Sequence, residues 1–272
     1  MSVVSTLRIY RSLLRQAGVV RRGGKPLALS KAIDVNAWGS YRFGNSNGDE
    51  EDSLQPPPII PGRLGDLLGQ EEAMSLQELM PRDEWPLEQV LTGTECEDLV
   101  KRLFRRAADN TCRKSNDDEA AVAVRRARLD DLAFTALRIA NALISQWYRS
   151  SVTDSDGVRV ILDYVYVQPD QSGRDIYAYR LIIENKRDHN VQLLGRHWLF
   201  EDNAGAIVEV PRWGEGVVGL QPCLRPGQWL EYVSGTTLEA SPGVMQGALL
   251  MVNEGGESWE AEVARLELAA ER

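Results

Sequence analysis

The sequence predicts a protein of α plus β class with two domains, a helical domain with a long insertion followed by an antiparallel β-sandwich. Between residues 94 and 149, apolar side chains recur every three or four positions, which is the period of a helix with one buried face. After Ser150 the pattern changes to alternation within short segments that end at Gly, Pro, Asn or Asp. A chain of 272 residues that is 43% hydrophobic is long enough to fill two cores.

Composition narrows the classes of function. No apolar run approaches the roughly 20 residues that a membrane-spanning helix needs. The three cysteines, Cys96, Cys112 and Cys223, are spaced too widely for a zinc pattern or a disulfide framework, so we expect buried or unreactive thiols in a reducing or neutral compartment. The two histidines, His189 and His197, exclude a histidine-rich metal site, and we predict no metal site.

The net charge of −9 conceals four blocks of alternating sign. Residues 1–48 carry eight Lys and Arg and one acid (+7), and residues 49–98 carry two and fourteen (−12). Residues 99–149 carry eleven and six (+5), and residues 150–272 carry ten and nineteen (−9). The first block has no acid before Asp34 and contains Arg and Ser, as mitochondrial transit peptides do. We therefore expect it to serve both as a mitochondrial address and as part of the fold.

The first helix is predicted in residues 1–22. Its apolar side chains fall on one side at helical spacing, and arginines line another side. The apolar members are Val3, Leu7, Tyr10, Leu14 and Ala17, and the basic ones are Arg8, Arg11 and Arg15. Such a helix packs on a core and presents its charges to solvent or to an acidic partner. Taken alone, the segment is explained better as an ordinary amphipathic surface helix.

Residues 23–93 form an insertion or linker that we predict to be partly irregular. Gly23-Gly24, the polar run 44–52 and Pro56-Pro57-Pro58 all oppose regular structure. The short apolar pieces Leu64–Leu68 and Leu76–Met80 fit single helical turns that lie on a neighbour. We expect much of the insertion to be extended and to gain order from a partner surface. For residues 44–58, a disordered and functionally silent linker is an equal alternative.

The second and third helices of the predicted bundle lie in residues 94–149. Thr94 and Glu97 have the spacing of a capping box, and an apolar stripe flanked by the basic run 101–106 follows. Asn116, three residues before a glutamate, repeats the start signal. From residue 122 to residue 147, apolar positions recur over roughly seven to eight turns of helix. Together with the first helix, these two give a three-helix bundle in which the apolar faces meet.

These helices resemble the LYR-motif family of small mitochondrial proteins that bind an acyl carrier protein. The name-giving triad reads Ile9-Tyr10-Arg11 here, so the Tyr and Arg match and the leading Leu does not. Leu103-Phe104-Arg105-Arg106 stands where the family has a basic run around a Phe in its second helix. The long insertion between the first and second helices departs from the family pattern.

The resemblance implies that an acidic helix of an acyl carrier protein lies across the basic residues, where ion pairs set docking and its rate. Its acyl-phosphopantetheine enters between the three helices and contacts Leu14, Phe104 and Leu132, and the protein has no cofactor of its own. For any single arginine, simple solvation is the better interpretation; for the whole set we favour the partner. The implied partner-binding residues are Tyr10, Arg11, Arg15, Lys101, Arg102, Phe104, Arg105 and Arg106.

Residues 156–268 are predicted to form a sandwich of the immunoglobulin or fibronectin type III kind, because seven short alternating segments are separated by turns. The predicted strands are Val158–Val167, Ile176–Glu184, Val191–Phe200, Ala206–Val210, Gln228–Tyr232, Val244–Val252 and Ser258–Leu268. This half resembles the ApaG domain, which has that architecture. The matching segments are residues 191–198, 214–219, 221–222, 224–227, 234–235 and 243–247.

The segment Gly214-x-Gly216-x-x-Gly219 taken alone suggests a dinucleotide-binding fold, which needs a strand before it and a helix after it. Gln221-Pro222 and another turn follow instead, so we reject that fold and assign the glycines to a loop that needs positive φ angles. A weaker possibility is that the loop amides of these three glycines and Arg196 hold an anion. We prefer the alternative that His197 is a hydrogen-bonded structural residue on a strand.

No paired catalytic carboxylates, no nucleophile with a histidine partner and no phosphate-binding loop before a helix stand out, so we predict that the protein is not an enzyme. We expect an adaptor of the mitochondrial matrix that binds acylated acyl carrier protein through its helices and a large assembly through its sandwich. Assembly of the large subunit of the mitochondrial ribosome is favoured, because the basic blocks suit contacts with rRNA.

Three alternatives remain open from the sequence. The first is a subunit or assembly factor of a respiratory complex. The second is a phosphate- or nucleotide-binding enzyme or binding module based on the ApaG domain. The third is a protein-interaction module outside mitochondria, because fold alone does not determine function.

Overall fold

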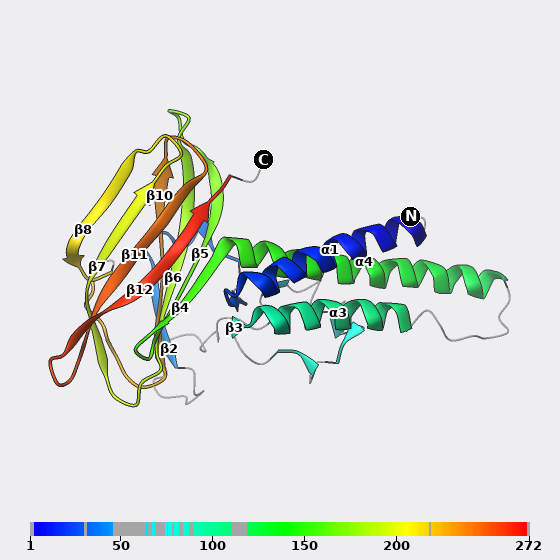
Figure 1. Ribbon diagram of the computed structural model, residues 1–272, viewed down its shortest axis with the longest axis horizontal. Coiled ribbons are helices and arrows are strands. Elements are labelled where there is room, and N and C mark those ends of the chain that lie inside the picture. Colours follow the sequence, from blue (N-terminus) through cyan, green and yellow to red (C-terminus); the bar gives the residue numbers. More distant parts are fainter. Residues whose placement is uncertain are drawn as a thin grey trace. The chain divides into compact units, whose positions relative to one another are not determined.

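The computed structural model describes residues 3–29, 32–45, 64, 67–68, 74, 76–77, 79–81, 84–86, 90–109, 119–217 and 219–270. Contacts within the chain divide it into two compact units. The first unit contains Met1–Ala32 and Pro61–Trp147, and the second contains Ile33–Ile60 and Tyr148–Arg272. The α-helices build the first unit and a β-sandwich builds the second (Figure 1).

Three long helices build most of the first unit in the part of the chain that the structure describes, together with helical residues of the insertion and a short two-stranded antiparallel sheet. These elements are α1 (Val3–Gly23), α3 (Gly93–Asp109) and α4 (Glu119–Arg149), with β1 (Leu27–Ala28) paired to β3 (Val90–Leu91). Helices α1 and α4 run in the same direction and α3 runs against them (Figure 1). Their apolar faces meet in one core, where Ala17, Leu103 and Leu143 are completely buried. None of the described helices has the length and apolar character needed to cross a bilayer.

The start of α3 differs from the prediction. The Thr92 amide donates to the Glu95 carboxylate at 2.7 Å, and the Glu95 amide donates to Thr92 Oγ1 at 3.2 Å. The capping box is therefore Thr92 with Glu95, and its prediction at Thr94 and Glu97 was wrong. Both pairs have the same spacing, and the two start positions differ by only two residues. The predicted cap at Asn116 lies outside the described residues.

The insertion contributes apolar side chains to the helical core. Leu64, Leu68 and Leu76 are helical and buried, and Met80 is 1% exposed just after a helical residue. This arrangement confirms the prediction that the apolar pieces around these residues form helical turns packed on a neighbour. Trp85 is tied to the same region, because its indole N–H donates to the Met80 carbonyl at 2.9 Å.

The second unit consists of two antiparallel sheets packed face to face, as predicted for a β-sandwich (Figure 1). One sheet has the strand order β2-β10-β6-β5-β4; the other has the order β12-β11-β7-β8, and β9 also pairs with β7. Between the sheets lies one core that includes Tyr177, Trp198 and Leu230. The strands are β2 (Tyr41–Asn45), β4 (Ser150–Ser155), β5 (Val158–Pro169), β6 (Asp175–Asn185), β7 (Val191–Glu201), β8 (Ile207–Glu215), β9 (Cys223–Leu224), β10 (Gln228–Leu238), β11 (Gly243–Asn253) and β12 (Ser258–Leu268).

The sandwich begins at Ser150, six residues before the predicted start at residue 156. Strand β4 follows α4 directly and pairs with β5 along its whole length. The hairpin turn is Asp156-Gly157, with φ angles of 48° and 74°, as a two-residue turn of type I′ requires. The sequence from 150 to 155 is mostly polar and lacks apolar alternation, which is why the pattern did not reveal this strand.

Strand β2 comes from the middle of the predicted irregular insertion. It pairs antiparallel with β10, from Tyr41 opposite Tyr232 to Asn45 opposite Gln228. A 3-10 helix (η1, Val35–Ala37) precedes it, and the Asp34 side chain caps that helix by accepting the Asn36 amide at 2.9 Å. Part of the insertion is therefore a regular edge strand of the sandwich.

Candidate functional site

The helical unit brings two predicted partner-binding residues into contact. The ring centroids of Tyr10 on α1 and Phe104 on α3 lie 4.3 Å apart, with the rings tilted by 45°. Phe104 is 8% exposed and Tyr10 is half-buried at the rim of the core. Leu14 and Leu132, which the LYR resemblance implies as contacts of the acyl chain, pack in the same core. Tyr10 therefore packs α1 against α3.

Two of the predicted basic residues are paired within the unit. Lys101 Nζ lies 2.9 Å from Glu97, whose other carboxylate oxygen accepts from Arg21 Nε of α1 at 2.6 Å. The hydrogen bond with Lys101 lowers the pKa of Glu97 and raises the pKa of Lys101 itself. Arg106 Nη2 lies 2.6 Å from Glu84. These cations stabilise the fold and are partly neutralised.

The other four basic residues are exposed. Arg11, Arg15, Arg102 and Arg105 make no ion pair with any residue that the structure describes, although Arg15 Nε donates to the Arg11 carbonyl at 3.3 Å. Four guanidinium groups are therefore available for an acidic surface. The eight predicted partner-binding residues thus divide into two aromatic residues in contact, two internally paired cations and four exposed arginines.

Helix α3 is not purely basic, which the sequence prediction overlooked. Its acids lie mostly in the first half and its bases follow, an order that complements the helix dipole. Arg102 and Arg105 line a shallow depression together with Lys101, Glu95 and Asp98. The surface of this helix is therefore polarised along its axis, with the exposed arginines in the second half.

The glycine motif begins within the last two residues of β8, and Gly216 just after the strand is hydrogen-bonded to β7. Arg196 Nη1 donates to the Gly216 carbonyl at 2.6 Å, and the Gly216 amide donates to the Leu194 carbonyl at 3.1 Å. Gly216 has φ +44°, and an added Cβ would lie 1.6 Å from the Leu220 carbonyl oxygen, so only glycine fits there. Arg196 and the Gly216 amide therefore bind carbonyls of the protein itself.

Two further described residues of this loop are bonded to each other. Val217 and Leu220 exchange backbone hydrogen bonds of 2.9 and 2.8 Å. Gly214 pairs with Arg196 across the ladder between β8 and β7, and Gly219 has φ +76° with open space around it. The structure thus brings Arg196, Gly214 and Gly216 together but directs their described polar groups inward to the loop. Because the sheets are antiparallel, the loop has none of the surroundings of a dinucleotide site.

His197 is a hydrogen-bonded residue of β7, in agreement with the preferred prediction. It is 9% exposed, and its Nε2 lies 2.9 Å from Glu209 on β8. Arg212 Nε donates to His197 Nδ1 at 3.5 Å. Arg212 also lies over the Trp213 ring at 5.2 Å and 3.3 Å from Glu260. This cluster ties β7, β8 and β12 together on one face of the sheet.

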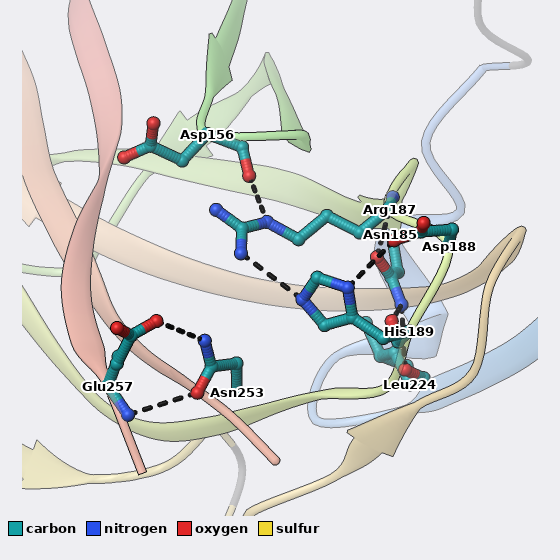
Figure 2. A network of polar contacts seen from close by, with 8 residues as sticks. All are labelled: Asp156, Asn185, Arg187, Asp188, His189, Leu224, Asn253 and Glu257. Carbon is teal, nitrogen blue, oxygen red and sulfur yellow. Dashed lines mark hydrogen bonds and ion pairs between the residues drawn. The ribbon is translucent and has the colours of Figure 1, made fainter. Parts of the chain in front are cut away.

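A polar network joins the loops at one end of the sandwich (Figure 2). Its centre is Asn185, which is completely buried at the end of β6. The side-chain amide of Asn185 donates to the carbonyls of His189 and Leu224, both at 2.9 Å, and its Oδ1 accepts the Arg187 amide at 2.9 Å. Two of these hydrogen bonds hold the 186–190 loop, and the third joins Asn185 to β9.

Arg187 extends this network to the neighbouring turns (Figure 2). Its Nε donates to the Asp156 carbonyl, and its Nη1 lies 3.2 Å from His189 Nε2. The guanidinium lies 4.3 Å from the centre of the Trp259 ring, a cation–π contact. His189 Nδ1 lies 2.8 Å from Asp188, and this hydrogen bond lowers the pKa of Asp188. Sequence reasoning missed the network, because the polar run 184–190 has the composition of a simple turn.

The cysteines differ in their surroundings. Cys96 is buried, and burial raises the pKa of its thiol to about 12, as expected for an unreactive thiol. Cys223 is exposed on β9, so burial holds for Cys96 and not for Cys223, and Cys112 lies outside the described residues. Within the described ranges, no three His, Cys, Asp or Glu side chains are grouped closely enough to hold a metal ion.

Comparison with known proteins identifies the sandwich. Residues 167–253 match the family described as ApaG domain. Protein ApaG of Thiobacillus denitrificans is 44% identical over 110 residues, which cover 85% of that protein and 40% of this chain. The chain belongs to the ApaG family. Protein ApaG of Rhodospirillum centenum is 42% identical over 120 residues, covering 91% of that protein and 44% of this chain.

The solved structures include a candidate ApaA protein from Bordetella pertussis, 35% identical, which covers 97% of that chain and 46% of this one at a TM-score of 0.40. The ApaG match contains Arg196, His197, the glycine loop and Asn185. The prediction of an ApaG β-sandwich is thereby confirmed. The LYR resemblance concerns the helices, which lie outside the ApaG match, and it stays a prediction.

Proposed function

We propose that this protein is a binding protein without enzymatic activity, in which the ApaG sandwich is a binding module and the helical unit binds an acidic protein. Membership of the ApaG family supports the first part. In the sandwich, Arg196, His197 and Asn185 bond to neighbouring groups of the same unit, as expected of residues that maintain a scaffold. The proposed site of action is the mitochondrial matrix, because the amino-terminal block is basic and almost free of acids.

The proposed partner of the helical unit is an acylated acyl carrier protein. The observation that carries this proposal is the contact of Tyr10 with Phe104 beside four arginines that have no ion pair among the described residues. An acidic helix on such a surface gains rim ion pairs of about 0.2–1 kcal/mol each, and their main effect is on the association rate. The apolar core below Tyr10 supplies the environment that an acyl chain needs. Acyl-phosphopantetheine belongs to the partner in this proposal, and the chain carries no cofactor of its own.

Affinity purification tests this part of the proposal. Tagged full-length protein, purified from mitochondria, is expected to recover acyl carrier protein, detected by mass spectrometry. The double substitution Arg11→Glu with Arg105→Glu is expected to abolish recovery, because it reverses one exposed charge on each of two helices. Arg265→Glu is a matched control, because Arg265 is exposed on β12 of the sandwich. Absence of the carrier from the wild-type sample, or equal recovery with the double variant, contradicts the proposal.

The second partner of the proposed adaptor is a large mitochondrial assembly. We favour the large ribosomal subunit, with rRNA meeting the basic blocks 1–48 and 99–149, over a respiratory complex. Sedimentation of mitochondrial lysate separates the two. Co-migration with the large subunit at low salt and its loss at high salt support the ribosome, whereas co-migration with a respiratory complex supports the alternative.

A phosphate- or nucleotide-binding role of the sandwich is the competing function. The amides of Gly216, Val217 and Leu220 and the Arg196 guanidinium are engaged within the loop, which opposes this role. We therefore expect calorimetry of the full-length protein with millimolar pyrophosphate or nucleotide to give no binding heat. A saturable heat that disappears in Arg196→Gln supports the anion site instead.

A further inference from the structure

Strand β2 occupies an edge that the ApaG domain does not itself cover. Residues 41–45 stand far before the ApaG match of residues 167–253, yet they pair with β10 over five residues. Without β2, strand β10 is the last strand of its sheet and presents unpaired backbone groups. A segment that lies far before the ApaG match in the sequence therefore completes the sheet.

Backbone hydrogen bonds set the register of this pairing. The Gly39 amide donates to the Val233 carbonyl at 2.9 Å, and the Val233 amide donates to the Ser40 carbonyl at 3.1 Å. Two consecutive residues thus face one residue, which is a β-bulge. Because bonded pairs alternate along an antiparallel ladder, the amides of Arg42 and Gly44 face β10, and those of Tyr41 and Phe43 face away.

Two contacts between tryptophan and glycine hold the ends of the segment. The Trp38 ring lies so close to Gly235 on β10 that an added Cβ there would be 1.8 Å from a ring carbon. Trp229 of β10 lies against Gly44 in the same way, with 2.2 Å to an added Cβ. Gly235 is therefore a socket for an indole ring, and Gly44 leaves room for Trp229.

The aromatic side chains of this segment leave much of their surface exposed to solvent. Trp38 and Tyr41 are each 48% exposed and Phe43 is 36% exposed, with the rings of Tyr41 and Phe43 meeting edge to face at 5.9 Å. The main contacts of β2 are thus hydrogen bonds of the main chain, each worth about 1 kcal/mol net. A peptide that adds a strand to a sheet edge is bound in the same manner, with pockets for alternate side chains.

We infer that the β10 edge is an acceptor site for an extended peptide segment of a partner protein, with Gly235 receiving a tryptophan, and that β2 is an internal segment that this peptide replaces. The inference rests on the proposed role of the sandwich as a binding module and specifies its partner class. It is independent of the acyl carrier protein, so the two proposals fail in separate experiments.

The test uses full-length protein and a fluorescent peptide of residues 36–45 as the probe, followed by fluorescence anisotropy. Arg42→Pro removes an amide that faces β10, so we expect it to detach β2 and leave the β10 edge free. Phe43→Pro is the matched control, because its amide faces away and proline is tolerated on that side of an edge strand. The peptide is expected to bind the Arg42→Pro protein about ten-fold more tightly than the wild type or the Phe43→Pro protein.

A second substitution tests whether Gly235 receives the tryptophan ring of the peptide. Gly235→Val added to Arg42→Pro is expected to abolish peptide binding, and a probe peptide with Trp38→Ala is expected to bind at least about ten-fold more weakly. The inference is overturned when Arg42→Pro gives no binding above wild type, or when Gly235→Val leaves binding intact. Should Arg42→Pro fail to fold, as judged by circular dichroism, Trp38→Ala in the full-length protein vacates the socket instead. No gain of peptide binding in that variant also overturns the inference.

Discussion

The two units of this protein use polar side chains in opposite ways. In the sandwich, Asn185 and His197 are buried or nearly so and bond to groups on neighbouring strands and loops. In the helical unit, Arg11 and Arg102 are exposed and have no ion pair among the described residues. We propose that these two uses correspond to two modes of recognition. In this proposal the exposed charges of the helical unit meet an acidic partner, and the backbone edge of the sandwich accepts a peptide.

The largest expected effect concerns the polar centre of the sandwich. Asn185→Leu removes three hydrogen bonds, two that the side-chain amide donates to the carbonyls of His189 and Leu224 and one that Oδ1 accepts from the Arg187 amide. We expect the free energy of unfolding to fall by about 3–4 kcal/mol. Hydrogen exchange of the β6, β7 and β9 amides in increasing denaturant measures this for the sandwich alone. Asn253→Leu, which affects one exposed turn, is the control and should lower the free energy of unfolding by less than about 1 kcal/mol. Equal losses in the two variants would contradict the assignment of Asn185 as the polar centre of the sandwich.

The second prediction tests whether the motif tyrosine is held by packing. Phe104→Ala removes a ring that is 8% exposed and in contact with Tyr10, so we expect a loss of about 3 kcal/mol in the helical unit. Hydrogen exchange in α1 and α3 is the measurement, and protection of the sandwich strands should stay unchanged. A loss of protection spread evenly over both units would contradict the separate cores.

The third prediction concerns a buried cation of the helical unit. Lys25 Nζ lies 4.8 Å from the centre of the Trp147 ring, and burial lowers the pKa of Lys25 to about 8. The folded state therefore disfavours the charged form, and this cost is complete below pH 8 and vanishes as pH rises toward 10.5. Lys25→Met should raise the melting temperature at pH 7, with the gain shrinking between pH 8 and 10.5. Lys186→Met, on the surface of the sandwich, is the control and should change neither the melting temperature nor its dependence on pH. A gain in melting temperature from Lys25→Met that is the same at every pH would contradict the lowered pKa of Lys25.

The smallest effect is expected in an exposed turn of the sandwich. Asp170 accepts hydrogen bonds from Ser172 Oγ at 2.7 Å and from the Arg174 amide at 3.0 Å, which lower the pKa of Asp170 well below its usual range. Stabilisation by this carboxylate is present above about pH 4 and is lost as pH falls further. Asp170→Asn should lower the melting temperature slightly at pH 7 and have less effect at pH 2. An equal effect at both pH values would show that charge is not involved.

Pattern and composition predicted the parts of the fold in which period and turn residues agree. The seven predicted strands correspond to β5, β6, β7, β8, β10, β11 and β12, because turn residues bound each of these short segments. Burial alternates along most of β7 and β12, whereas β5 and β6 are buried in continuous runs. Strand β4 and strand β2 were missed, since 150–155 is mostly polar and Tyr41–Asn45 lies in a segment with the composition of a linker. Both are edge strands, where pairing through the backbone makes few demands on side chains.

The candidate sites were predictable only in part for a similar reason. Tyr10 and Phe104 are apolar at helical positions, so their meeting follows from the amphipathic pattern. The pair of Lys101 with Glu97 has the i,i+4 spacing of a local helix pattern, whereas the pair of Arg106 with Glu84 depends on packing of separate segments. The same holds for Asn185, whose three partners come from two separate segments, and for Gly235, whose importance lies in its contact with Trp38.

The most direct measurement is a binding titration of the full-length protein with purified acylated acyl carrier protein at low and high ionic strength. The proposed function predicts saturable binding that weakens about ten-fold between 50 and 300 mM salt and is lost in the Arg11→Glu, Arg105→Glu variant. Binding that is absent at low salt, or that is unaffected by both salt and the double substitution, would contradict a cationic docking surface on the helices.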